Sequence, residues 1–115
     1  MRGDEERLRD VLEAIERIEK YSTRGRSAFE SDELIQTWIL HYLQIIGEAC
    51  RSVSDELQNR FPDIPWPKIA GMRNILVHQY FGIDKDAVWA VVENEISPLR
   101  DQIGQVLDGL PDAED

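Results

Sequence analysis

Apolar residues recur at spacings of three and four along most of this chain, which is the pattern of amphipathic helices. The first stripe predicts a helix over residues 4–21, with Asp4 as its N-cap. A short polar run containing a glycine ends this helix. The second stripe predicts the longest helix, which begins at a Ser31 cap and runs to about Arg60. Gly47 lies inside it, either because a neighbouring helix approaches closely or because the glycine is merely tolerated.

Prolines mark two of the remaining boundaries, and the segment 81–83, which contains a glycine, marks the third. Three of them between residues 61 and 67 break the chain, because each fixes φ and lacks a backbone N–H. A third helix is predicted over about 66–80, and a fourth begins near residues 84–86. Pro98 lies inside the last apolar stripe and should kink that helix or restart it after Ser97.

The pattern as a whole predicts one all-α domain over residues 1–115. We find no strand alternation, no internal repeat and no interdomain linker in the sequence. An antiparallel bundle of four main helices fits this organisation, with a frayed acidic tail at 110–115.

Composition narrows the possible functions. The formal net charge is −10, from 13 basic and 23 acidic residues, which argues against general binding of duplex DNA or RNA. The chain lacks the apolar core of a signal peptide and has no apolar run long enough to cross a bilayer. We therefore expect a cytoplasmic protein that does not act in a membrane.

Isolated cysteine, tryptophan and histidine residues have plain structural interpretations. We expect Cys50 to be a small buried hydrophobe in a reducing compartment. Trp38, Trp66 and Trp89 are expected to be core and interface anchors rather than platforms for base stacking. His41 fits packing or capping better than a ligand role. Two distant histidines without a cysteine or carboxylate cluster predict no metal site, and no glycine-rich phosphate loop indicates a cofactor.

The stretch from Met72 to Phe81 concentrates the chemically useful side chains. Arg73 can bind anionic oxygen, His78 can move protons near neutral pH, and Asn74 and Tyr80 add an amide and a phenol. Over residues 60–80 the formal charge is +3 − 1 = +2, because this segment contains Arg60, Lys68 and Arg73 and one acidic residue, Asp63. An anionic ligand would therefore be favoured here, although a histidine near a helix end can also be only a hydrogen-bonded cap.

Helix geometry limits how these side chains can meet. At about 100° per residue, Asn74 and His78 share one face, and Arg73 and Tyr80 nearly eclipse each other on another. Arg73 and His78 are five apart, so they diverge by about 140°. They can converge through distortion at the helix end, or through a second copy of the chain across a two-fold axis.

The spacing Arg73, four residues, His78, one residue, Tyr80 resembles the Arg-x4-His-x-Tyr motif of the HEPN superfamily, and specifically of its HepT-like branch. The resemblance spans nearly the whole chain. Its flanks are the segments 47–50, 64–66, 69–74 and 78–84, with Trp89 at the head of the last helix.

This resemblance implies a helical bundle that forms a homodimer, with two copies of the motif in an interface cleft. It also implies a toxin of a toxin–antitoxin system that cleaves RNA as a metal-independent endoribonuclease, with Arg73 and His78 catalytic. Asn74, Tyr80 and Lys68 would support catalysis or bind RNA. The implied antitoxin is an MntA-like minimal nucleotidyltransferase that adds AMP to Tyr80. The alternative is a non-catalytic accessory or substrate-binding subunit of a nucleotidyltransferase.

Overall fold

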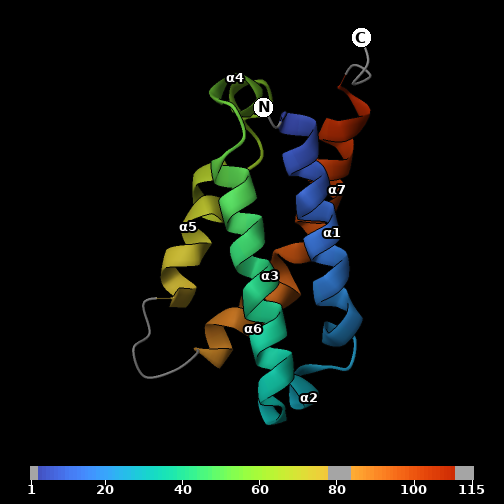
Figure 1. Cartoon of the computed structure of the whole chain (residues 1–115), viewed down its shortest axis with the longest axis vertical. Coiled ribbons are helices and arrows are strands. Elements are labelled where there is room, and N and C mark those ends of the chain that lie inside the picture. The colour runs from blue at the N-terminus through green and yellow to red at the C-terminus, as the bar shows by residue number, and fades with distance from the viewer. Residues whose placement is uncertain (1–2, 78–83, 111–115) are drawn as a thin grey trace.

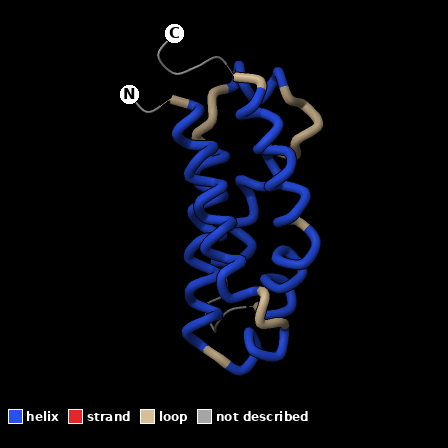
Figure 2. The backbone as a smooth tube through the Cα atoms, turned by 90° about the vertical axis from the view of Figure 1, so that its right-hand side faces the viewer, coloured by secondary structure: helices blue, strands red, loops and turns tan. Residues whose placement is uncertain are grey.

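The computed structural model describes residues 3–77 and 84–110, with the backbone alone described over 73–77. Every secondary-structure element in these residues is a helix, as Figure 2 shows. The helices are α1 (Asp4–Ser22), α2 (Arg26–Ser31), α3 (Glu33–Arg51), α4 (Asp55–Arg60), α5 (Trp66–Val77), α6 (Lys85–Asn94) and α7 (Ile96–Asp108). The predicted all-α fold is confirmed.

The bundle is organised around α3. This helix packs against α1 and α5, while α1 also contacts α7. Figure 1 shows α1 and α3 running in opposite directions, with α5 and α7 on either side of this pair. The short helices α2 and α4 lie at opposite ends of the bundle. The arrangement places α5, which carries the first half of the motif, on the flank of the central helix.

The core consists of the apolar stripes that the sequence pattern predicted. On α1 and α3 the fully buried leucine, isoleucine and valine side chains are those of Leu8, Val11, Ile15, Ile18, Ile39, Leu43 and Ile46. Each contributes about 1.5–3 kcal/mol when it is moved from water into such an interior. Facing stripes of this length explain why α1 and α3 form the most extensive helix pair.

The capping of α1 differs from the prediction. Gly3, not Asp4, is the N-cap residue, and it provides no side-chain hydrogen bond. Asp4 instead accepts hydrogen bonds from the backbone N–H of Ser54, at 2.9 Å, and from its hydroxyl. The carboxylate thus links the start of α1 to the turn that follows α3, a contact fifty residues away in sequence.

The predicted second helix, from Ser31 to about Arg60, is two helices, α3 and α4. Ser31 ends α2 and is not a cap, because Asp32 caps α3 by accepting hydrogen bonds from Leu34 and Ile35. The chain then leaves helix after Arg51 and starts α4 from Ser54, whose hydroxyl accepts from Leu57 N–H. Apolar periodicity continues across these breaks, which is why the pattern alone did not reveal them.

The last apolar stripe is interrupted as predicted, but earlier. Glu95 separates α6 from α7, so the break precedes Ser97. Pro98 then lies in the first turn of α7, where backbone N–H groups have no partner within the helix and the missing donor costs little. Asp84 caps α6 by accepting from Ala87 N–H at 3.0 Å.

Several single-residue predictions have clear outcomes. Cys50 is buried, and burial raises the pKa of its thiol to about 12. Trp66 and Trp89 are core residues, whereas Trp38 is only partly buried. Gly47 is buried, which does not separate its two interpretations. Residues 111–115, the end of the predicted frayed tail, lie outside the described part of the chain. Among the described residues, no helix is long and apolar enough to cross a membrane.

Candidate active site

The helix α5 carries the first half of the motif. It begins directly after the proline-rich break, where the Trp66 indole N–H donates to the carbonyl of Phe61 at 3.0 Å. Ile69 and Met72 are buried on this helix, which packs against α3. The core contacts of α5 therefore hold the backbone immediately before Arg73 in place.

The structure describes only part of the predicted constellation. The backbone of Arg73 and Asn74 lies in α5, and the helix continues to Val77, one residue before His78. His78 and Tyr80 lie outside the described residues. A helix is thus confirmed over the N-terminal part of the predicted 66–80 segment, while the convergence of Arg73 with His78 and Tyr80 stays a prediction.

Lys68 has a partner that the sequence did not indicate. Its ammonium lies 3.0 Å from a carboxylate oxygen of Glu95, the residue between α6 and α7. The two side chains are 64% and 38% exposed, so the pair is solvated and is worth at most about 1 kcal/mol. An anionic ligand could therefore displace Glu95 at modest cost.

Because of this ion pair, the net charge around α5 is lower than the count along the sequence predicted. Counting Glu95 with residues 60–80 changes the sum from +3 − 1 = +2 to +3 − 2 = +1. A groove of about 130 Å³ lies beside the pair between α5 and α7, and Pro65, Met72 and Pro98 are among its lining residues. The positive character of this region is therefore weaker than the contiguous sequence predicted.

A second group of polar and aromatic side chains lies away from α5. Tyr21, Trp38, His41 and Tyr42 line a groove of about 790 Å³ between the end of α1 and the first half of α3. His41 is exposed and is not a core residue, and its ring lies edge-on to Tyr42 with centroids 4.9 Å apart. Sequence reasoning treated these residues one at a time, although the four-residue step from Trp38 to Tyr42 was a usable signal.

The family of the chain follows from comparison with known proteins. A family described as Ribonuclease HepT-like matches residues 11–106, which include all of the helices from α2 to α6. The chain belongs to this family. The match includes every residue of the Arg73, His78 and Tyr80 motif, and it confirms the resemblance seen in the sequence.

Relatives with HepT or RNase names cover most of this chain. A protein of Thermococcus cleftensis named as a probable ribonuclease HepT is 35% identical, over 86% of this chain and 91% of its own. A protein of Methanocaldococcus jannaschii provisionally named as an RNase is 31% identical, over 84% and 89%. A longer protein of the same organism, named for gamma-glutamylcyclotransferase and provisionally for RNase, is 34% identical over 90% of this chain. This chain spans 47% of that longer relative. No solved structure gave a significant match.

Proposed function

We propose that this chain is a HepT-type endoribonuclease that cleaves RNA without a metal ion, in a site formed by Arg73 and His78. Membership of the Ribonuclease HepT-like family carries this proposal, together with an intact Arg-x4-His-x-Tyr motif. The α5 backbone supports it, because a helix that is anchored by core contacts up to Met72 is a rigid support for Arg73.

The proposed reaction is an internal phosphoryl transfer. The 2′-hydroxyl attacks the neighbouring phosphorus, so a 2′-O–P bond forms and the bond to the 5′-oxygen breaks. One imidazole removes the 2′-hydroxyl proton and an acid protonates the leaving 5′-oxygen, a pair of roles that suits His78 near neutral pH. Arg73 holds the non-bridging oxygens as negative charge develops. The products are a 2′,3′-cyclic phosphate and a 5′-hydroxyl.

A homodimer provides the simplest way to assemble this site. Arg73 and His78 are five positions apart in sequence, so one regular helix directs them about 140° apart. A two-fold axis next to α5 would bring two copies of each residue into one cleft, and one His78 could act as base while the other acts as acid. Asn74, Tyr80 and Lys68 would orient the imidazole or contact the RNA.

Regulation is proposed to act on Tyr80. A cognate MntA-like nucleotidyltransferase antitoxin would transfer AMP to the Tyr80 hydroxyl, releasing pyrophosphate from ATP. Each AMP adds about 329 Da and a negative phosphate, which would compete with RNA for Arg73. Tyr80→Phe should abolish the mass increase in intact-protein mass spectrometry after incubation with antitoxin, ATP and magnesium. Equal modification of Tyr80→Phe would refute this assignment.

The ribonuclease proposal is tested directly by cleavage. Purified protein should cut single-stranded RNA in EDTA and leave cyclic phosphate ends, whereas His78→Ala and Arg73→Ala should be inactive and remain folded. Activity that is the same in wild type and both variants would refute the assignment. No cleavage by wild type, combined with tight binding to a nucleotidyltransferase, would instead favour the accessory-subunit alternative, which the net charge of −10 motivates.

A further inference from the structure

We propose that the groove between the end of α1 and the first half of α3 binds single-stranded RNA, with bases against its aromatic side chains and phosphates against Lys20 and Arg24. This inference rests on the proposed ribonuclease function, because it assigns a binding surface to the same substrate. The groove is separate from the Arg73, His78 and Tyr80 motif in sequence, and it is lined by Tyr21, Trp38, His41 and Tyr42 among others.

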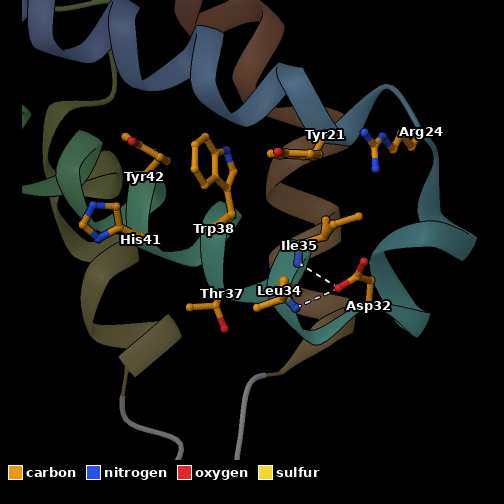
Figure 3. A pocket seen from close by; sticks show the side chains of 9 residues that line it. All are labelled: Tyr21, Arg24, Asp32, Leu34, Ile35, Thr37, Trp38, His41 and Tyr42. Carbon is orange, nitrogen blue, oxygen red and sulfur yellow. Dashed lines mark hydrogen bonds between the residues drawn. The ribbon is translucent and has the colours of Figure 1, made fainter.

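The aromatic residues form one continuous surface. Trp38 lies between Tyr21 and Tyr42, with ring centroids 5.2 Å and 5.1 Å away, and His41 stands edge-on to Tyr42 (Figure 3). The Trp38 indole N–H donates to the carbonyl of Arg17 at 2.6 Å, which fixes the ring on α1. Unstacked bases bind to such surfaces because every base has an apolar face, and each stack is worth about 1–3 kcal/mol.

The adjacent cations are available for phosphate. Lys20 and Arg24 are exposed, and neither has a carboxylate partner in the part of the chain that the structure describes. Their charged groups lie near the aromatic rings, with Arg24 Cζ 4.8 Å and Lys20 Nζ 5.7 Å from the Tyr21 centroid. Both side chains are long and solvated, so they can turn toward a phosphate without breaking an ion pair.

Local charge favours an anionic occupant. Several charges of residues 17–26 are already paired: Arg17 with Glu13, Arg26 with Glu30 and Asp86, and Glu19 with Arg100. Lys20 and Arg24 are the cations of this segment without a carboxylate partner among the described residues. Asp32 also lines the groove, but its carboxylate accepts N–H groups at the start of α3 and is directed to that helix end (Figure 3). The groove thus has two unpaired cations, Lys20 and Arg24, beside its aromatic residues on a strongly acidic protein, and these can attract the phosphates of a polyanion.

A second copy of the chain fits this surface less well. A two-fold dimer formed through the groove would enclose two copies of these cations, and the one carboxylate that lines the groove, that of Asp32, already accepts N–H groups of α3. Leu34, 80% exposed beside the groove, is an apolar contact that a ribose or base could also cover. The charge distribution therefore favours RNA over self-association at this face.

The test measures binding separately from cleavage. A labelled twelve-nucleotide 2′-O-methyl RNA lacks the attacking hydroxyl, so it can bind but cannot be cut. Fluorescence anisotropy should show at least tenfold weaker binding by Lys20→Ala/Arg24→Ala than by wild type. For single strands, a plot of the logarithm of the association constant against the logarithm of the salt concentration has a negative slope of about 0.7 per phosphate contact. The double variant lacks two such contacts, so the magnitude of its slope should be smaller by about 1.4.

A matched control shows whether weaker RNA binding comes from lost contacts in the groove or only from the lower number of positive charges. Arg9→Ala/Arg51→Ala removes the same two charges from exposed positions at the other end of the helix pair, about 16 Å from Lys20 along α1 and about 20 Å from Trp38 along α3. This control should bind within twofold of wild type. RNA should also quench tryptophan emission, and Trp38→Phe should abolish the quenching because the other two tryptophans are buried.

The outcomes distinguish this inference from the ribonuclease proposal. Equal weakening by both double variants, no binding by wild type, or a groove variant that changes only the oligomeric state would overturn the groove assignment. Groove-dependent binding with no cleavage of ordinary RNA would support the groove and count against the ribonuclease. Cleavage of RNA by a protein whose RNA binding does not depend on the groove residues would support the ribonuclease proposal and count against the groove.

Discussion

The ion pair between Lys68 and Glu95 should limit how well the α5 region binds RNA. Lys68 is one of the proposed RNA contacts, and Glu95 holds its ammonium at 3.0 Å. Replacing Glu95 with glutamine removes the competing charge and keeps the size of the side chain. Because the pair is solvated and worth at most about 1 kcal/mol, the gain in RNA affinity should be at most about fivefold.

The assay is binding of the uncleavable 2′-O-methyl RNA to His78→Ala protein, with and without Glu95→Gln. We expect the dissociation constant to fall two- to fivefold. Glu56→Gln is the matched control, because Glu56 is exposed on α4 and the change in net charge is the same. It should change affinity much less than Glu95→Gln.

A double-mutant cycle identifies the side chain responsible. In a Lys68→Ala background, Glu95→Gln should have no more effect than Glu56→Gln, because the released ammonium is gone. Equal gains from Glu95→Gln and Glu56→Gln would show that only net charge matters. A full gain from Glu95→Gln without Lys68 would also refute the reasoning, since another cation would then be the one released.

Three further predictions concern the fold. Leu43→Ala should lower the free energy of unfolding in urea by about 2–5 kcal/mol, because Leu43 is fully buried on the central helix; a loss below 1 kcal/mol would contradict this packing. Asp4→Ala should cost about 1 kcal/mol through its lost hydrogen bonds to Ser54, and unchanged stability in the same urea titration would contradict the link. Cys50 should resist a thiol reagent at pH 8 until the protein unfolds. Since burial raises its pKa from 9.0 to about 12, the unfolded thiol ionises first, and stability should fall as pH rises from 9 toward 12.

The helical fold was readable from the sequence because its signals are local. Apolar spacing along residues 4–21 depends only on the helix period, and the structure buries that stripe. The proline-rich break and the helix start near residues 84–86 also depend on nearest neighbours, and both are present. For the same reason the Arg73, His78 and Tyr80 motif could be recognised as a string of residues and then matched to a family.

Other features depended on residues that are distant in sequence. Asp4 binds Ser54 instead of capping its own helix, because the antiparallel packing of α1 and α3 brings these residues together. Lys68 meets Glu95 through the same kind of contact, so a charge count along the sequence overestimated the positive region. Tyr21 joins Trp38 and Tyr42 only because α1 packs on α3. The sequence determined the helical fold and the Arg73, His78 and Tyr80 motif, whereas tertiary packing decided which distant side chains share a surface, since helix periodicity contains no information about contacts between helices.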